Sequence, residues 1–204
     1  MKLYIAPVAP NPTRVKTFVL EKGLVETGDV ELVPISLFDG EHRSDIHLKR
    51  NPAGTIPVLE LDDGSFINES LSIMQYLEEQ FPEPCMTGRT TIEKVRAYEA
   101  ERKIEFSVFF RIVRLVHATN SPLGLPKNPG IEESETKNLP NGLGRTNLQL
   151  QQNEFVMGDA PTIADCTLFA GLFFGEFFSW SVPDEYPHII RWYEAFKQRP
   201  SAQL

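Results

Sequence analysis

Signals for β-strands occur only in the first third of this 204-residue chain. They stop before the proline-punctuated stretch Phe81-Pro82-Glu83-Pro84, and helical patterns follow it to the end. A chain whose two parts differ this sharply in pattern predicts an α/β unit followed by an all-α unit. We therefore expect an α/β domain over residues 1–82, a linker over 83–90 and an all-helical bundle over 91–204.

The order of elements in the first domain narrows the fold further. Lys2–Ala6 and Val30–Ile35 are short and apolar, as buried strands are, and a helix between them begins at Asn11, with asparagine as its N-cap and proline at the first helical position. Residues 58–67 carry a hairpin signal around an Asp-Asp-Gly turn, and another helix opens at Glu69. The order is βαβ followed by ββα, which is the thioredoxin-like layout.

The second domain is expected to contain helices only. A long helical pattern covers residues 92–118, and a further helix resumes over 148–155. Between them, proline, glycine and polar residues crowd together over 121–144, which predicts a loop. Thr162 and Asp165 form a capping-box pair at the start of a helix that is apolar on nearly every side, so we assign both a structural role and expect this helix at the centre of the domain.

Charge and cysteine usage exclude several classes of function. A net charge of −8 disfavours a nucleic-acid partner, because phosphate backbones would be repelled. The N-terminus has no signal-peptide pattern, and no apolar stretch reaches the roughly 18 residues of a membrane span. Cys85 and Cys166 lie far apart, in neither a metal-ligand nor a redox spacing. We expect a cytoplasmic protein with reduced thiols, no metal and no membrane partner.

Three segments of the chain resemble one superfamily, the cytosolic glutathione transferases. Asn51–Pro82, with the sequence NPAGTIPVLELDDGSFINESLSIMQYLEEQFP, is similar to the glutathione-binding block of that family. Pro10–Leu24 resembles its first helix, and Thr162–Asp165 resembles its N-capping box. The resemblance covers most of the chain apart from residues 120–147. It implies glutathione as co-substrate, a small-molecule electrophile as second substrate, and a homodimer.

The resemblance also implies how glutathione is held. The peptide bond before Pro57 should be cis, with the backbone of Ile56 pairing with the cysteinyl part of the ligand. Glu69 should take the ammonium group, while Ser70 and the free amides of the helix N-terminus take the γ-glutamyl carboxylate. One of three charged residues before the block, His42, Arg43 or Lys49, should meet the glycine carboxylate; the alternative is that they form a solvated surface run. Thr55 belongs to the expected glutathione site, but it stands where Ure2p-like members often have a basic residue, so the glycine end of the ligand is expected to be held less firmly or from elsewhere.

The thiol-activating residue is less conventional. No Tyr, Ser or Cys stands between Ile5 and Pro10, and Tyr4 lies inside a strand, where we expect it in the core. The segment PNPTRV is similar to the PNG motif of the Ure2p-like and nu-class members, in which the asparagine activates the thiol, although Pro12 replaces the glycine. The resemblance thus assigns Asn11 as the catalytic residue. The alternative is that Asn11 only caps its helix.

The long helix after the linker supplies the expected electrophile pocket. Its apolar residues Phe106 and Phe110 and its basic residues Arg111 and Arg114 are the candidates, although a basic stripe at this spacing is also typical of a solvated face. The leading hypothesis is a transferase that conjugates the glutathione thiolate to a partly apolar electrophile. The alternatives are a glutathione-dependent disulfide oxidoreductase of the Ure2p type and a non-catalytic glutathione-binding module.

Overall fold

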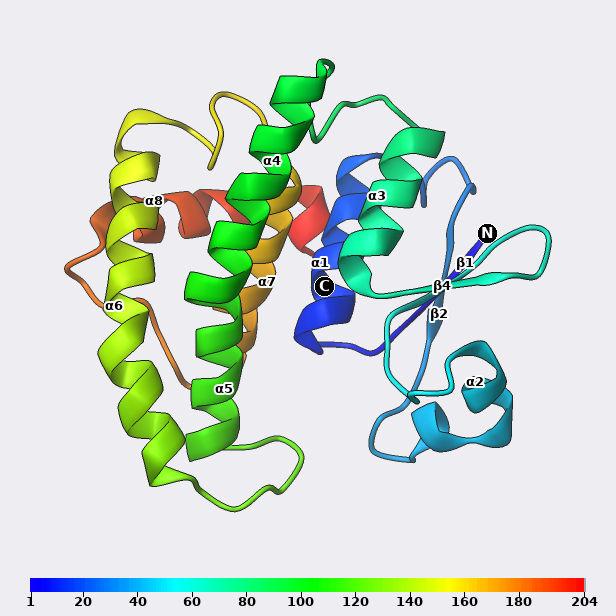
Figure 1. Cartoon of the computed structure of the whole chain (residues 1–204), viewed down its shortest axis with the longest axis horizontal. Coiled ribbons are helices and arrows are strands. Elements are labelled where there is room, and N and C mark those ends of the chain that lie inside the picture. The colour runs from blue at the N-terminus through cyan, green and yellow to red at the C-terminus, as the bar shows by residue number, and fades with distance from the viewer. Residues whose placement is uncertain (204) are drawn as a thin grey trace. The chain divides into compact units, whose positions relative to one another are not determined.

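The computed structural model describes residues 1–203 and contains two compact units (Figure 1). One unit comprises residues 1–84 together with Pro200 and the residues after it, and the other comprises Cys85–Arg199. All strands of the described chain lie in the first unit, and the second is built of helices. The expected fold class, α/β followed by all-α, is therefore confirmed. The return of the C-terminal segment to the first unit, where the Ser201 hydroxyl donates to Glu21, was not anticipated by a division at residues 83–90.

The first unit is organised around a four-stranded mixed sheet. Its order is β2 (Glu31–Pro34), β1 (Lys2–Ile5), β3 (Val58–Glu60) and β4 (Phe66–Asn68). Strand β1 runs parallel to β2 and antiparallel to β3, and β3 runs antiparallel to β4, as the βαβ and ββα order predicts. The buried side chain of Tyr4 packs in the sheet core and donates its hydroxyl to Glu60 at 2.6 Å.

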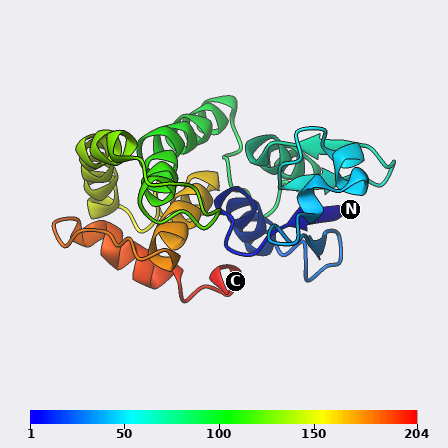
Figure 2. The same cartoon turned by 90° about the horizontal axis from the view of Figure 1, so that it is seen from below.

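Two helices of this unit carry the residues of interest below. Helix α1 (Pro10–Glu21) packs against α3 (Ser70–Gln80), whereas α2 (Asp45–Arg50) is a short helix in the connection before β3 (Figure 2). The ends of α1 and α3 are joined by a buried ion pair, in which the Lys22 ammonium lies 2.7 Å from the Glu78 carboxylate. The two helices are thus fixed together by apolar packing and by a polar contact.

Helix α1 begins two residues earlier than the sequence predicts. Ala9 is the N-cap, with extended backbone angles, and its carbonyl accepts the N–H of Thr13 at 2.9 Å. Pro10 takes the first helical position, where a missing N–H costs nothing and a fixed φ favours the helix. Asn11 is therefore the second helical residue and makes no capping bond. The prediction that Asn11 is the N-cap was wrong.

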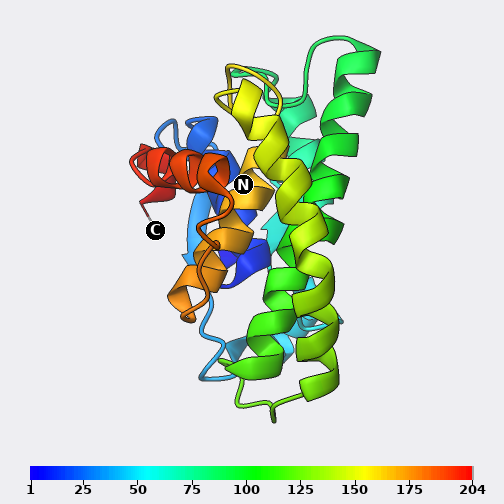
Figure 3. The same ribbon diagram turned by 90° about the vertical axis from the view of Figure 1, so that its left-hand side faces the viewer.

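The second unit consists of α4 (Thr91–Ile104), α5 (Phe110–Thr119), α6 (Pro129–Gln152), α7 (Ile163–Phe177) and α8 (Pro187–Phe196). A π-helical turn, Glu105–Phe109, connects α4 to α5, so the long helix expected over 92–118 is present with this turn in its middle. Helices α5 and α6 lie side by side (Figure 3). Helix α7 has most of its residues buried and forms the expected centre. Short 3₁₀ turns occur at Glu41–Arg43 and Pro200–Ala202.

The loop expected over 121–144 was wrong for most of its length, because α6 starts at Pro129. The Asn128 side chain caps it by accepting the N–H of Ile131 at 3.1 Å, and proline fits the first position. Farther along, Gly142 packs so closely on the preceding helix that a Cβ there would lie 2.1 Å from the Ser107 carbonyl oxygen. Tertiary packing thus stabilises a helix that the local sequence disfavours.

Candidate functional site

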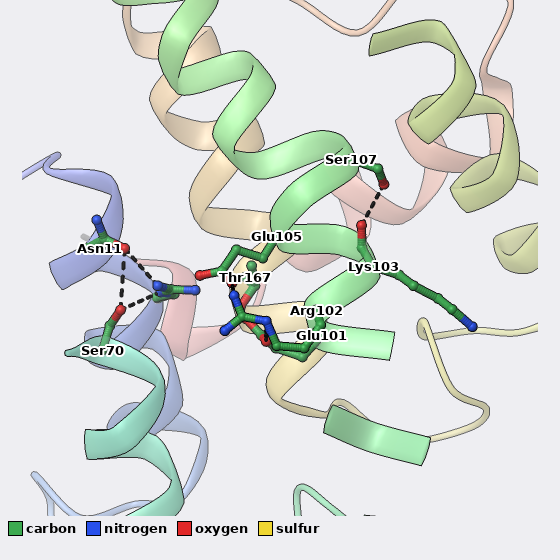
Figure 4. A network of polar contacts seen from close by, with 9 residues as sticks. Asn11, Ser70, Glu101, Arg102, Lys103, Glu105, Ser107 and Thr167 are labelled. Atoms are coloured by element: carbon green, nitrogen blue, oxygen red, sulfur yellow. Dashed lines mark hydrogen bonds and ion pairs between the residues drawn. The ribbon is translucent and has the colours of Figure 1, made fainter. Parts of the chain in front are cut away.

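A polar cluster joins the start of α1 to the start of α3 (Figure 4). The buried guanidinium of Arg14 donates from Nε to Ser70 Oγ at 2.8 Å and from Nη2 to Asn11 Oδ1 at 2.8 Å. The Ser70 hydroxyl donates to the same Asn11 oxygen at 3.3 Å. Because a guanidinium has only donors, the atom of Asn11 that faces it must be the amide oxygen. Figure 4 shows the Asn11 nitrogen turned away from Ser70.

The orientation of Asn11 leaves its amide N–H groups available. No residue in the described part of the chain accepts a hydrogen bond from Asn11 Nδ2. The side chain is only partly buried, so a ligand can approach the amide. Asn11 therefore presents a hydrogen-bond donor close to a helix N-terminus, and a buried cation polarises the amide from its oxygen side.

The N-terminus of α3 has the features of an anion site. Glu69, its N-cap, adopts a left-handed φ of 70°, which a non-glycine residue takes only when the surrounding structure holds it there. The amide N–H groups of Ser70, Leu71 and Ser72 donate to no residue within positions 1–203. Three unpaired amides at the positive end of a helix are suited to a carboxylate.

The backbone before β3 is open for pairing. The peptide bond between Ile56 and Pro57 is cis, as the resemblance implies. Pairing of β1 with β3 starts only at Tyr4 and Val58, and neither the N–H nor the C=O of Ile56 bonds to any described residue. Ile56 can therefore pair with an extended peptide-like ligand, as an edge strand does.

The loop that precedes Ile56 is held by its own side chains. The carbonyl oxygen of Thr55 contacts His47 Nε2 at 3.0 Å and accepts from Asn51 Nδ2 at 2.9 Å. Asn51 Nδ2 also reaches Thr55 Oγ1, at 2.8 Å. Thr55 thus has a loop-fixing function that the sequence does not reveal.

The three candidates for the glycine carboxylate, His42, Arg43 and Lys49, differ in charge and in their contacts. Arg43 is exposed, and its Nη1 donates to the Ala53 carbonyl at 3.1 Å. Burial, followed by the charges of Arg43 and His47, lowers the pKa of His42, so this residue is neutral at neutral pH. Lys49 is exposed, and no described residue contacts its ammonium group. Arg43 and Lys49 are thus both exposed cations, but Arg43 already bonds to the loop, so Lys49 is the cation whose ammonium group is available to a carboxylate.

In the helical unit, the expected electrophile residues separate into two pairs. Phe106 is exposed, and its ring centroid lies 6.2 Å from that of Phe110. Arg111 Nη1 and Arg114 Nε instead bind the two oxygens of Glu135, at 2.9 and 2.7 Å. Because the Glu135 side chain is only 5% exposed, the basic stripe is partly neutralised by a buried carboxylate on α6.

Thr162 and Asp165 form a capping box at the start of α7. One oxygen of Asp165 accepts the backbone N–H and the hydroxyl of Thr162, each at 2.9 Å. The other accepts the Val156 N–H at 2.8 Å and the Trp192 indole N–H at 3.2 Å. Complete burial nevertheless raises the pKa of Asp165 to about 6. The carboxylate holds the start of α7 to two other segments, and Figure 4 shows Thr167, one turn farther along α7, bonded to Glu101.

Other kinds of site find no support in residues 1–203. No group of three His, Cys, Asp or Glu residues there is arranged to hold a metal ion. Within the same residues no helix is long and apolar enough to cross a membrane. Cys85 and Cys166 form no disulfide with each other.

Sequence reasoning missed Arg14, which orients the cluster. An arginine three residues after an asparagine lies on the same helix face, so their proximity was predictable in principle. The link to Ser70, 56 positions away, was not, because it depends on how α1 packs on α3.

Comparison with known proteins agrees with this geometry. The family model described as "Glutathione S-transferase, N-terminal domain" matches residues 3–85, and the one described as "Glutathione S-transferase, C-terminal domain" matches 127–200. Glutathione S-transferase 2 of Saccharomyces cerevisiae is 31% identical over 211 residues, covering 100% of this chain and 88% of that protein.

Solved structures extend the similarity to the whole fold. A glutathione S-transferase domain-containing protein of Marinobacter aquaeolei has a TM-score of 0.89 and 32% identity, covering 100% of both chains. A glutathione S-transferase-I bound with lactoylglutathione has a TM-score of 0.79 and 28% identity, covering 99% of this chain and 96% of that one. With both family domains and a full-length relative at this identity, the chain belongs to the glutathione S-transferase family.

Proposed function

We propose that the protein is a glutathione transferase that binds glutathione on its N-terminal unit and transfers the thiolate to a partly apolar electrophile. The observation that carries this proposal is the fixed amide of Asn11, whose N–H groups face away from Arg14 and Ser70. A donor held in this way is suited to a developing negative charge, because it needs no reorganisation when the charge forms.

Glutathione binding would use three features already described. The γ-glutamyl carboxylate would accept the amide N–H groups at the start of α3, and the Glu69 carboxylate would take the neighbouring ammonium group. The cysteinyl backbone would pair with the N–H and C=O of Ile56 beside Pro57. Lys49 is the cation available for the glycine carboxylate. Ser70 contributes its backbone amide, since its hydroxyl already bonds within the cluster.

Asn11 would then activate the thiol without itself exchanging a proton. The thiol proton leaves to solvent, and the remaining thiolate accepts an N–H of Asn11. A hydrogen bond to a charged group contributes about 1.5–3 kcal/mol, and the helix N-terminus about 0.3–1 kcal/mol. Together they can lower a thiol pKa by about 1–3 units at about 1.36 kcal/mol each. The thiolate attacks the electrophilic carbon, a C–S bond forms, and the leaving group departs with its electron pair.

A disulfide substrate remains the second candidate for the same site. A bound thiolate can attack sulfur as well as carbon, and this reaction requires no protein cysteine. Cys85 and Cys166 form no disulfide with each other. For assembly and location we propose a homodimer in the cytoplasm. Size-exclusion chromatography with light scattering tests the former and cell fractionation the latter.

The test of the proposed function has two stages. Isothermal titration calorimetry with glutathione should give a saturable heat, and the absence of any heat at millimolar glutathione would refute the proposal. Initial rates with a chlorinated nitrobenzene and with hydroxyethyl disulfide, both at saturating glutathione, then separate conjugation from disulfide reduction. A higher kcat/KM for the disulfide would show that reduction is the main reaction.

A further inference from the structure

The helical unit contains a cavity of about 400 Å³ that the proposed reaction does not use. It is lined by the end of α5, the first half of α6 and the segment between α7 and α8, and it is partly open to solvent. Its walls are largely apolar and aromatic, with Leu115, Val116, Leu139, Leu143, Phe178 and Trp180 among them. A volume of this size, with walls of this kind, is typical of small-molecule sites.

None of the four candidate electrophile residues, Phe106, Phe110, Arg111 and Arg114, lines the cavity. Val116 and Thr119 line the cavity, whereas Phe110 and Arg114 do not. At about 100° per residue, these two pairs point roughly 120–180° apart around the helix. A ligand in the cavity would therefore occupy a second site and not the electrophile pocket.

The aromatic wall of the cavity is held rigidly by the end of α7. The N–H of Trp180 donates to the Gly175 carbonyl at 2.8 Å and the N–H of Ser179 donates to the Glu176 carbonyl at 3.0 Å, with Ser179 at a left-handed φ of 69°. This is a Schellman motif. A Cβ on Gly175 would lie 2.6 Å from the indole, so the glycine lets Trp180 lie flat on the helix.

Apart from the indole N–H of Trp180, the polar side-chain groups of the cavity are carboxylates or hydroxyls. Pro140 has no N–H for the carbonyl of Thr136, and both residues line the cavity, so α6 presents there a carbonyl without its usual helical donor. Glu132 and Glu185 add two carboxylates at the wall. No lysine, arginine or histidine is among the lining residues.

We propose that this cavity is a binding site for a small aromatic molecule that carries a cationic or hydrogen-bond-donating nitrogen. The flat rings of the ligand pack between the aliphatic side chains and Trp180, and its cation faces the carboxylates, the freed carbonyl and the indole face. Glutathione, with two carboxylates, is excluded by the same charges.

The direct test uses proflavine, a planar aromatic cation, with the full chain and isothermal titration calorimetry. Thr136 is exposed at the cavity wall, so Thr136→Trp fills the space without disturbing the core. We expect it to weaken proflavine binding roughly tenfold or more. The matched control Lys137→Trp places the same side chain on the neighbouring exposed position outside the cavity, and it should bind as wild type does.

Charge and location are tested separately. Glu132→Gln and Glu185→Gln should each weaken proflavine roughly two- to fivefold and should leave the anionic dye anilinonaphthalene sulfonate no weaker. Equal proflavine affinity in Thr136→Trp and wild type, or tighter binding of the sulfonate than of proflavine, would overturn the proposal. Displacement of proflavine by saturating glutathione would also overturn it. Glutathione binding by Thr136→Trp should remain unchanged, which keeps this result independent of the transferase reaction.

Discussion

Replacement of Asn11 by alanine should raise the pKa of the bound glutathione thiol. The variant removes one N–H donor to the thiolate, worth about 1.5–3 kcal/mol. At about 1.36 kcal/mol per unit, this corresponds to a rise of about 1–2 units. At a pH below both pKa values, the thiolate fraction and the conjugation rate should fall by roughly ten- to a hundredfold. Glutathione affinity should change little, because the carboxylate and backbone contacts are elsewhere.

An aspartate at the same position separates activation from a purely structural role. In Asn11→Asp, Arg14 can still bind one oxygen, but the other replaces the N–H donor and faces the thiolate. Two like charges about 4 Å apart repel by about 1–4 kcal/mol, depending on how far water screens them. The thiol pKa should therefore increase from wild type to Asn11→Ala to Asn11→Asp. If Asn11 only stabilised its helix, the thiol pKa would be the same in all three proteins. Asn11→Asp would then stabilise the helix, because an acid in the first turn interacts favourably with the helix dipole.

The assay is the ultraviolet absorbance of the thiolate as a function of pH at saturating glutathione. Calorimetry on each variant establishes that the ligand is bound. Asn138→Ala serves as the control, since Asn138 is only partly buried and donates only to the Ser134 carbonyl of its own helix. If Asn11→Ala and Asn138→Ala give the same thiol pKa as wild type, Asn11 does not activate the thiol, even if the protein conjugates glutathione.

Three further predictions concern stability, measured by urea unfolding. Lys22→Ala should destabilise the protein by about 3–5 kcal/mol, because it leaves the buried Glu78 carboxylate without its cation, and Lys22→Met with Glu78→Leu should recover most of this loss. Burial raises the pKa of Asp165 to about 6, so the folded chain binds more protons than the unfolded chain. The contribution of Asp165 should therefore fall by up to about 3 kcal/mol between about pH 4 and 6, and Asp165→Asn should lack this slope. Ser179→Gly should stabilise by about 1 kcal/mol, because glycine adopts the left-handed conformation without a Cβ clash, and an unchanged unfolding midpoint would contradict this reasoning.

The N-terminal fold was predictable because its signals are local. A strand that is buried on both faces, a short hairpin turn and a capped helix each reveal themselves within about ten residues. The position of Tyr4 in the sheet core follows from its place inside the first strand, and the structure agrees. The start of α1 was displaced by two residues because Pro10 competes with Pro12 for the first helical position, and local rules do not rank the two.

Helix α6 was not predictable from local sequence because its stability comes from elsewhere. Pro140, Gly142 and Gly144 each disfavour a helix in isolation. Gly142, however, allows close approach to the Ser107 backbone, and Glu135 binds Arg111 and Arg114 on the facing helix. The residues that weaken the local helix signal are thus among those that make the packing possible.

The chemistry of the candidate site depends on which side of the Asn11 amide faces the ligand, and no local sequence pattern determines this orientation. An asparagine offers an acceptor on one side of its amide and a donor on the other, and only the donor can stabilise a thiolate. The choice is made by Arg14 and Ser70, which hold the oxygen from two helices. It follows that Ser70→Ala, which removes one partner from both Arg14 and Asn11, should raise the thiol pKa by less than Asn11→Ala does. The Arg14 bond alone still holds the amide oxygen in this variant.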